Sequence, residues 1–331
     1  MSDPTTAADP AAVPDLGMNA RAWALADRMV ERAGELRVSA HTLGNGARVI
    51  DAGVDVPGGL GAGLALAELC MGGLGHVGYA PVVIDGETWS GVQVWTDHPA
   101  ASCMAAQYAG WAVQRDKYFA MGSGPLRAHA RVEKELFAKL GYAERAERGV
   151  LVLETRTLPT DDVAAYVAER AGLPASALTF AVAPTASLAG GVQVVARVLE
   201  TGLHKMETLG FDVGRVVSGT GTAPVPPLAK TDLRGIGRTN DCVLYGGQAR
   251  YVVRAEDDEL AALAEKLPAS ASGDYGTPFY DIFERYGRDF YKIDPLLFSP
   301  AEVWLTSATS GRTFHAGRLD AGVLRASLYE R

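Results

Sequence analysis

The sequence predicts a mixed α/β fold that is large enough for two domains. Residues 149–209 alternate strand-like and helix-like patterns in the order strand, helix, strand, helix, which is typical of parallel strands joined by helices. Elsewhere, alternating apolar runs flank short glycine turns, which indicates antiparallel strand pairs. Because 48% of the 331 residues are hydrophobic and 21% are charged, the chain can bury a large core.

The composition excludes several classes of partner. The net charge is −8 and the Lys and Arg residues form no dense cluster, so neither nucleic acid nor an anionic membrane is expected to bind. No apolar run has the length of a membrane span, and residues 1–17, which lack a signal-peptide pattern, are expected to form a disordered tail. Cys70, Cys103 and Cys242 are far apart and form no disulfide framework, which favours a cytoplasmic location.

The first third of the chain predicts a helix, a hairpin and a glycine-rich helix. The first helix begins at Asn19, its expected cap, and ends near Gly34. Asn45-Gly46 between two apolar runs predicts the hairpin. Residues 57–75 lead into a helix over residues 60–71. Because their glycines miss the G-x-G-x-x-G spacing, we expect close packing there rather than a bound dinucleotide.

The middle of the chain predicts four further structures. Apolar runs on both sides of Gly86 indicate a strand pair, and residues 100–114 are expected to form a helix. Residues 122–125, GSGP, predict a loop that enters another helix. This loop can offer backbone N–H groups to an anion or a carbonyl, or can serve as a connector. After it, residues 149–209 predict two strands, a helix capped by Thr160, and a long amphipathic helix from Ser187 to Leu209.

The last third predicts a loop, two strand pairs and one helix. Residues 216–230 contain too much Gly and Pro for a regular element, so we expect a loop. Residues 240–255 indicate a strand pair around Gly246-Gly247, and residues 257–267 a short helix. Ser310-Gly311 marks a final hairpin.

One face of the predicted long helix is polar. Gln193, Arg197, Glu200 and His204 recur at helical spacing, about 130° around the helix from its apolar stripe. Such a face can be solvated, with an Arg–Glu pair that contributes only a few tenths of a kcal/mol. Against this interpretation, Arg before Glu is the less favourable order for the helix dipole, and glycines at 190, 191 and 202 weaken the helix. The spacing leaves both interpretations open.

Elimination points to a carboxylate base. The six histidines lack metal-ligand spacing, there is no G-x-S-x-G, and no cysteine has a basic context. We therefore expect neither a metal site nor a serine or cysteine nucleophile. Glu200 remains as a candidate general base on water, with Arg197 holding its carboxylate by a charge-assisted hydrogen bond; a purely structural ion pair stays open as the alternative.

Nine separated segments carry a further signal. They are VIDAGVDVPGG, ELCMGGLG, TDHPA, YFAMGSGP, APTAS, VQVVARVLETG, GRTNDCVLYGG, SASGDYGTPFYDIF and DFYKIDPLLFSPAEV. In this order they resemble the methenyltetrahydromethanopterin cyclohydrolase family, and the match runs from about residue 19 to residue 317.

The resemblance implies two intimately packed α+β domains over residues 18–331, with a pocket between them, in a cytoplasmic homotrimer. It implies hydrolysis of 5,10-methenyl-tetrahydromethanopterin to the N5-formyl form in one-carbon metabolism and formaldehyde oxidation, without a metal or a redox cofactor. Arg197 and Glu200 in ARVLE match the family's catalytic arginine and glutamate. The candidate pocket residues are Asp97, His98, Gly122, Ser123, Thr185, Ser187, Gln193, Asn240 and Asp241.

One position departs from the family, and two other functions stay open. Where many relatives have a lysine in a QKAGW-like segment, this chain has Tyr108, so a cation is missing there. The alternatives are a non-catalytic pterin-binding subunit and a nicotinamide-dependent one-carbon dehydrogenase that uses residues 57–75. Binding of the methenyl compound without turnover would favour the first, and binding of NAD(P) the second.

Overall fold

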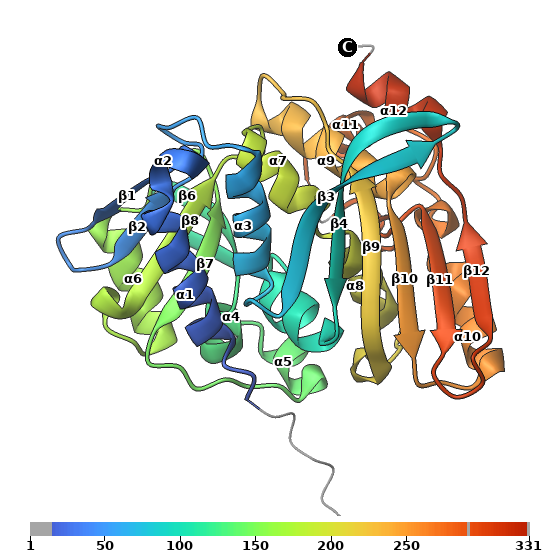
Figure 1. The fold of residues 1–331 in the computed structure, drawn as a ribbon, viewed down its shortest axis with the longest axis horizontal. Helices are drawn as coiled ribbons and strands as arrows, with labels where there is room; N and C mark the ends of the chain where they lie inside the picture. The colour runs from blue at the N-terminus through green and yellow to red at the C-terminus, as the bar shows by residue number, and fades with distance from the viewer. Residues whose placement is uncertain (1–14, 290–291, 330–331) are drawn as a thin grey trace, which may run out of the picture.

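A computed structural model describes residues 15–289 and 292–329 of the chain. The chain forms two six-stranded sheets that lie side by side, with helices packed around and between them (Figure 1). This is the mixed α/β architecture that the sequence predicts. Of the predicted tail, only residues 15–17 belong to the described part. Within it, Leu16 donates its backbone N–H to the Tyr142 hydroxyl at 3.4 Å.

The first sheet combines parallel and antiparallel strands. Its strands are β1 (Ser39–Thr42), β2 (Arg48–Asp51), β5 (Trp111–Arg115), β6 (Tyr118–Ser123), β7 (Gly149–Glu154) and β8 (Leu178–Ala183). Their order is β1-β2-β8-β7-β6-β5, in which β2, β8 and β7 are parallel and the other pairs are antiparallel. Its helices are α1 (Met18–Glu31), α2 (Ala33–Leu36), α3 (Leu60–Cys70), α4 (Leu126–Ala130), α5 (Lys134–Leu140) and α6 (Asp161–Ala171).

Helices cover both faces of the first sheet. Val150 and Val152 of β7 belong to the core under α1 and α3, whereas Leu151 and Leu153 belong to the core under α6. Successive residues of a strand point to opposite faces, so one strand contributes to both cores. This double burial explains why residues 149–153 form a continuous apolar run.

The second sheet is mainly antiparallel. Its strands are β3 (Gly75–Ile84), β4 (Glu87–Thr96), β9 (Val216–Pro224), β10 (Gln248–Val253), β11 (Glu302–Ser307) and β12 (Thr313–Gly317), in the order β12-β11-β10-β9-β4-β3. Only β10 and β11 are parallel. The remaining helices are a π-helix (Ala100–Gln107), α7 (Leu188–Val195), α8 (Val198–Thr208), α9 (Asp232–Gly246), α10 (Asp257–Lys266), α11 (Phe279–Arg285) and α12 (Ala321–Leu328). Short 3-10 turns cover Ala175–Ala177, Val213–Arg215, Ala269–Ala271 and Pro295–Leu297.

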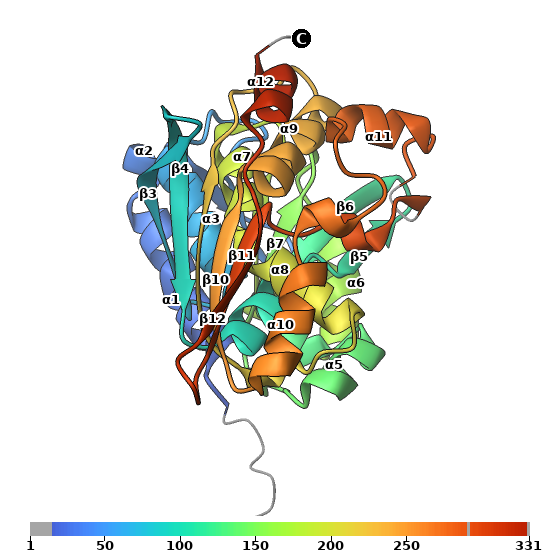
Figure 2. The same ribbon diagram turned by 90° about the vertical axis from the view of Figure 1, so that its right-hand side faces the viewer.

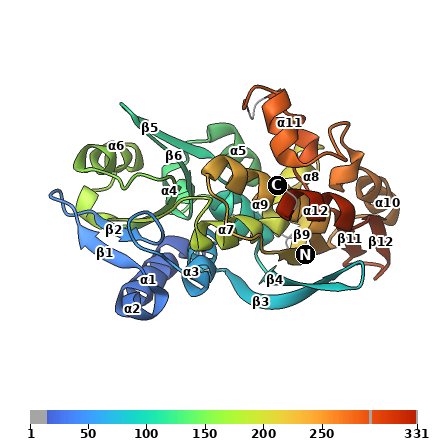
Figure 3. The ribbon, with the colours of Figure 1, turned by 90° about the horizontal axis from the view of Figure 1, so that it is seen from above.

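Only one face of the second sheet carries helices. α8, α9 and α10 pack on this face, and no helix of the described chain covers the opposite one (Figures 2 and 3). A row of large side chains crosses the uncovered face. Trp95, 46% exposed, stacks on His76 at 4.2 Å, and Trp304 lies between His315 at 4.7 Å and the Arg250 guanidinium at 3.8 Å.

The two sheets are interleaved along the chain. The β3–β4 hairpin belongs to the second sheet, but it lies in sequence between β2 and β5 of the first. The chain therefore passes between the sheets three times, through α3, through the π-helix and through α7 with α8. The last of these passages positions the candidate site.

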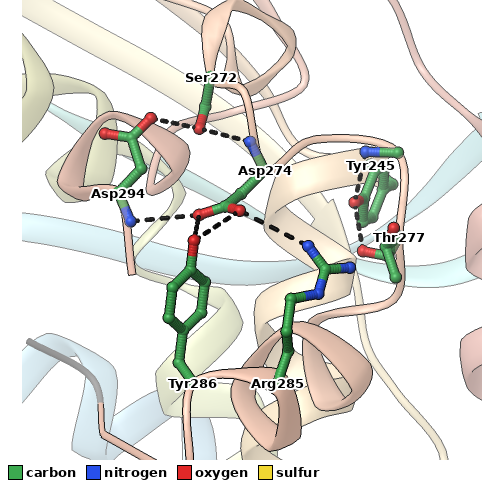
Figure 4. A network of polar contacts seen from close by, with 8 residues as sticks. Tyr245, Ser272, Asp274, Thr277, Arg285, Tyr286 and Asp294 are labelled. Carbon is green, nitrogen blue, oxygen red and sulfur yellow. Dashed lines mark hydrogen bonds and ion pairs between the residues drawn. The ribbon is translucent and has the colours of Figure 1, made fainter. Parts of the chain in front are cut away.

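A network of polar contacts holds the aromatic-rich stretch that contains α11 (Figure 4). The Asp274 carboxylate accepts the Tyr286 hydroxyl at 3.1 Å and the Asp294 backbone N–H at 3.3 Å, and it lies 3.7 Å from the Arg285 guanidinium. Tyr245 of α9 donates its hydroxyl to a backbone carbonyl of the same stretch at 2.6 Å. The Asp274 contacts hold the stretch together, and the Tyr245 bond attaches it to α9.

Several predicted elements are confirmed. β1 and β2 form the hairpin around Asn45-Gly46, and α3, the β3–β4 pair and the β11–β12 hairpin lie where the sequence predicts them. β7 and β8 are parallel, as the alternating passage predicts. Thr160 caps α6, because its hydroxyl accepts the backbone N–H of Val163 at 3.5 Å.

Two predictions for the first half are wrong. Residues 100–114 form a π-helix followed by β5, because Trp111 and Val113 point into the core while Gln114 is exposed, the alternation of a strand. Asn19 does not cap α1, since Gly17 occupies the cap position. The buried Asn19 side chain instead donates to the Pro125 carbonyl at 2.9 Å.

Two predictions for the second half are also wrong. Residues 216–224 form β9 rather than a loop, and its glycines leave room for α8. A Cβ at Gly221 would lie 2.9 Å from the Val198 side chain. Residues up to Gly246 belong to α9, not to a strand. The missed signal was Thr231, whose hydroxyl caps that helix by accepting the Arg234 N–H at 3.3 Å.

Candidate active site

The predicted long helix is broken, and the break builds the site. α7 ends at Val195 and α8 begins at Val198, with Arg197 at φ −81° and ψ 7° between them. At the break, the Gln107 side chain donates its Nε2 to the Ala196 carbonyl at 3.1 Å. The prediction of one continuous helix is therefore wrong. The physical reason for the break is the bond that the distant Gln107 makes to the Ala196 carbonyl.

The Arg197 guanidinium joins four elements. Its Nη2 donates to Ser123 Oγ of β6 and to Gln193 Oε1 of α7, each at 3.0 Å, and lies 3.8 Å from Cys70 Sγ of α3. Its Nη1 donates to the backbone carbonyl of Gln107, the last residue of the π-helix. Because the side chain is only 7% exposed, these bonds form in a water-poor environment and fix the corner between α7 and α8.

Glu200 lies one helical turn later, and its carboxylate has a different environment. It is 5% exposed, and no residue of the described chain donates a hydrogen bond to it. Burial raises its pKa above the ordinary 4.5, and electrostatic interactions with Arg197, His204 and Arg127 counteract part of this rise. The predicted hydrogen bond from Arg197 to Glu200 is not found within the described residues. The guanidinium is turned to other partners and acts on Glu200 only through space.

A second buried cation lies near this carboxylate. Arg127 is fully buried, donates its Nε to Glu133 at 2.7 Å, and donates its Nη1 to two carbonyls of the π-helix at 3.1 Å. Its guanidinium lies 5.2 Å from the centre of the Tyr108 ring, which stacks on His204 at 5.0 Å with an interplanar angle of 16°. Tyr108, at the position where the resemblance implies a lysine, thus has a cation beside it.

The structure brings some of the predicted pocket residues together. Ser123 and Gln193 both bind Arg197, and Gly122 precedes Ser123 on β6. Thr185 and Ser187 lie at the start of α7, away from Arg197. The Thr185 hydroxyl donates to Glu154, and the Ser187 hydroxyl caps the helix by accepting a backbone N–H at 3.0 Å.

The other predicted pocket residues bind elsewhere. Asp97 and His98 are exposed at the end of β4, where Asp97 accepts the Ser218 hydroxyl at 2.7 Å. Asn240 donates its side-chain amide to a carbonyl within α9 at 2.8 Å. Asp241, with a pKa that burial raises to about 7, accepts a backbone N–H at the start of α11 at 2.8 Å and the hydroxyl of Ser327 on α12 at 2.5 Å. In these contacts Asp241 attaches α12 to α9.

Glycines in α8 and in the stretch of residues 57–75 allow neighbouring elements to pack closely. A Cβ at Gly202 would lie 2.2 Å from the Tyr251 hydroxyl of β10, so this glycine lets α8 approach the second sheet. In the glycine-rich stretch of residues 57–75, a Cβ at Gly63 would lie 2.5 Å from Val192 of α7. These contacts support the interpretation of close packing over a dinucleotide site.

Sequence reasoning missed four side chains of the site: Cys70, Gln107, Arg127 and Glu133. None belongs to a periodic pattern, and each reaches the site from another element. The one available signal was the loop of residues 122–125, which precedes Arg127 closely. Within residues 15–289 and 292–329, no three His, Cys, Asp or Glu side chains gather as a metal-binding group. In the same residues, no helix is long and apolar enough to cross a membrane.

Comparisons with known proteins give one consistent result. The family described as Cyclohydrolase (MCH) matches residues 17–328. The chain is 47% identical to the methenyltetrahydromethanopterin cyclohydrolase of Methylobacillus flagellatus over 92% of each chain. It is 43% identical to the protein of that name from Methanocaldococcus jannaschii, over 95% of this chain and 98% of the relative. For the one from Rhodopirellula baltica, the identity is 48% over 85% of this chain and 86% of the relative.

Proposed function

Because the chain belongs to the Cyclohydrolase (MCH) family, we propose that it hydrolyses 5,10-methenyl-tetrahydromethanopterin to the N5-formyl compound in one-carbon metabolism. The observation that carries the mechanism is the environment of Glu200. Its carboxylate is buried and, among the described residues, accepts no hydrogen bond. A carboxylate in this state has its lone pairs available for the proton of a water molecule, as a general base requires.

The substrate's own charge makes the reaction accessible to such a base. The methenyl carbon lies between two nitrogens as a cationic amidinium and is already electrophilic. Water adds to this carbon while Glu200 takes one of its protons. The bond from carbon to N10 then breaks as N10 takes this proton from the Glu200 carboxylic acid, and Glu200 takes the proton of the added hydroxyl as that oxygen becomes the formyl carbonyl. The substrate cation would also lower the pKa of Glu200, which favours its ionised form during attack.

Arg197 supports the reaction as a positioning residue. Its guanidinium holds Gln107, Ser123 and Gln193 around the corner from which α8 starts, so it fixes the direction in which Glu200 projects. Its positive charge also opposes the rise in the pKa of Glu200 that burial causes. We propose this double role in place of a direct hydrogen bond between the two side chains.

The reaction as proposed uses no metal and no redox cofactor, because a cationic amidinium needs no Lewis acid and no electrons are exchanged. The pocket between the two sheets is part of the same proposal. The position of Arg197 between elements of both sheets supports it.

Loss of the methenyl absorbance on addition of enzyme is the direct assay. We expect the wild-type protein to remove this absorbance and Glu200→Gln to do so far more slowly with an intact fold. Full kcat in Glu200→Gln would overturn the assignment of the base. Tight binding of the methenyl compound without turnover by the wild type would instead identify a non-catalytic pterin-binding subunit.

We further propose that the protein is a cytoplasmic homotrimer, as its resemblance to the family implies. Three buried free cysteines support a reducing compartment, and the uncovered face of the second sheet is a surface that subunits could share. Light scattering coupled to size-exclusion chromatography tests the trimer: a mass of one 34.9 kDa chain would contradict it.

A further inference from the structure

The proposed reaction releases a proton next to a buried base. The methenyl compound carries one positive charge, water carries none, and the N5-formyl product is neutral, so each turnover leaves one proton behind. In the proposed function, on which this inference rests, Glu200 holds this proton when the formyl product has formed. A buried carboxylic acid becomes a base again only when that proton moves to another group.

Glu200 interacts electrostatically with Arg197, Arg127 and His204, and also with Cys103 and Tyr251. The guanidinium groups of the two arginines are hydrogen-bond donors without an acceptor site, so they do not take up a further proton. Burial raises the pKa of the Cys103 thiol and of the Tyr251 hydroxyl, so both stay neutral and neither is a base. His204 differs from these groups, because the ring of a neutral imidazole has one nitrogen with a free lone pair that can accept a proton.

The position of His204 fits this role. It follows Glu200 by four residues on α8, so both side chains project from one face of the helix, with Cβ atoms about 5–6 Å apart. Glu200 is buried, whereas His204 is only half-buried and reaches solvent. The ring of Tyr108 stacks on the imidazole at 5.0 Å and thereby restricts its orientation.

We propose that His204 carries the released proton from Glu200 to solvent and that Tyr108 holds the imidazole in place for this transfer. The carboxyl O–H bond of Glu200 breaks as an N–H bond forms on the neutral imidazole, and the imidazolium then gives the proton to solvent. The Glu200 carboxylate is ionised again for the next water molecule.

Several charged groups on neighbouring elements lie near the His204 ring. Glu200 lies on the same helix, and the Tyr108 ring that stacks on the imidazole also has the Arg127 guanidinium 5.2 Å from its centre. The next turn of α8 carries Glu207, which pairs with Lys139 of α5. Arg127 thus places a positive charge beside Tyr108, and Glu200 and Glu207 place carboxylates on the helix that carries His204.

The test compares His204→Phe with the wild type. Phenylalanine keeps an aromatic ring to stack on Tyr108 but has no nitrogen that can bind and release a proton. The matched control is His41→Gln, at an exposed histidine on β1. Initial rates of methenyl absorbance loss are measured at saturating substrate and constant ionic strength, with imidazole buffer varied from low to high concentration. Circular dichroism checks that each variant is folded.

We expect kcat of His204→Phe to be roughly 100-fold below wild type at low buffer, with KM unchanged, and to rise with imidazole concentration. The wild type and His41→Gln are expected to be insensitive to buffer. Wild-type kcat in His204→Phe at low buffer, or a reduced kcat that imidazole does not restore, would overturn the proton path alone. If the wild type leaves the methenyl absorbance unchanged, the proposed function is wrong, and the proton path that rests on it is wrong as well.

Discussion

Arg197 and Glu200 lie three residues apart at the start of α8, and both are almost fully buried. The guanidinium donates hydrogen bonds to oxygen atoms of Gln107, Ser123 and Gln193. The Glu200 carboxylate accepts none from the described residues. One charge is thus embedded in a network that compensates its burial, and the other retains most of its desolvation cost.

The two side chains therefore have different roles, although their spacing in the sequence suggests a single ion pair. A buried charge with its hydrogen bonds satisfied stabilises the arrangement of the elements around it. A buried charge without partners destabilises the fold and is available to a ligand, which is typical of catalytic groups. The following variants test whether Arg197 and Glu200 differ in this way.

The largest effect is expected from Glu200→Gln. The amide has nearly the same shape but cannot accept the proton of water, so kcat should fall by about 10²- to 10⁴-fold. Because a buried charge is removed, the free energy of unfolding near neutral pH should not decrease. Rates of absorbance loss and urea unfolding measure the two quantities. A variant that loses stability together with activity would contradict the contrast with Arg197.

Arg197→Met is expected to lower stability most. The three oxygen atoms that accept from the guanidinium would lose their donors in the interior, at a cost of about 3 kcal/mol in the free energy of unfolding. Activity should fall as well, because the corner before Glu200 loosens. Urea denaturation measures the change, with Arg32→Met, on the surface of the first helices, as a control expected to unfold at the wild-type urea concentration. An Arg197→Met protein as stable as the wild type would show that the network is not needed.

The pH dependence of stability should reveal the Glu200 carboxylate. Its pKa in the folded protein lies above the ordinary 4.5, so the folded state binds the proton more tightly than the unfolded state does. Ionisation therefore costs stability at pH values above the folded pKa, and this cost disappears as the pH falls toward 4.5. The stability of Glu200→Gln minus that of the wild type should be positive at pH 8 and shrink on acidification. If this stability difference instead grows on acidification, folding lowers the pKa of Glu200 rather than raising it.

The smallest effect is expected from Ser123→Ala. It removes one of the guanidinium's acceptors, 3.0 Å from Nη2, while Gln107 and Gln193 still bind Arg197. We expect a loss of about 1 kcal/mol in the free energy of unfolding and a few-fold decrease in kcat. Thermal unfolding and initial rates provide the measurements, with the exposed Ser176→Ala as control. A loss as large as that of Arg197→Met would mean that Ser123 has a further role.

The sequence predicts best what depends on neighbouring residues. Thr160 caps α6 because its partner Val163 is three residues away, and Asn45-Gly46 makes its hairpin through its own turn. Likewise, the helical period alone predicts that Arg197 and Glu200 share one polar face. Each of these features results from local geometry that a short stretch of chain contains.

What the sequence cannot show depends on partners that are distant along the chain. The break before Arg197 contains no Gly or Pro, and it coincides with bonds to Gln107 and Ser123, which are 90 and 74 residues away. The glycines of β9 suggest a loop, although they are needed because α8 packs directly on that strand. Both errors have one cause, since close contact between elements leaves no periodic pattern.

The interleaving of the two sheets also constrains how the chain can be made. The β3–β4 hairpin leaves the ribosome early, but β9, which pairs with β4 and covers its edge, begins only at Val216. Translation from Thr96 to Val216 takes on the order of ten seconds, during which the apolar side chains of Val92 and Val94 have no sheet to join. The nascent hairpin is therefore the segment most exposed to misassociation, and chaperone binding during synthesis should concentrate on it.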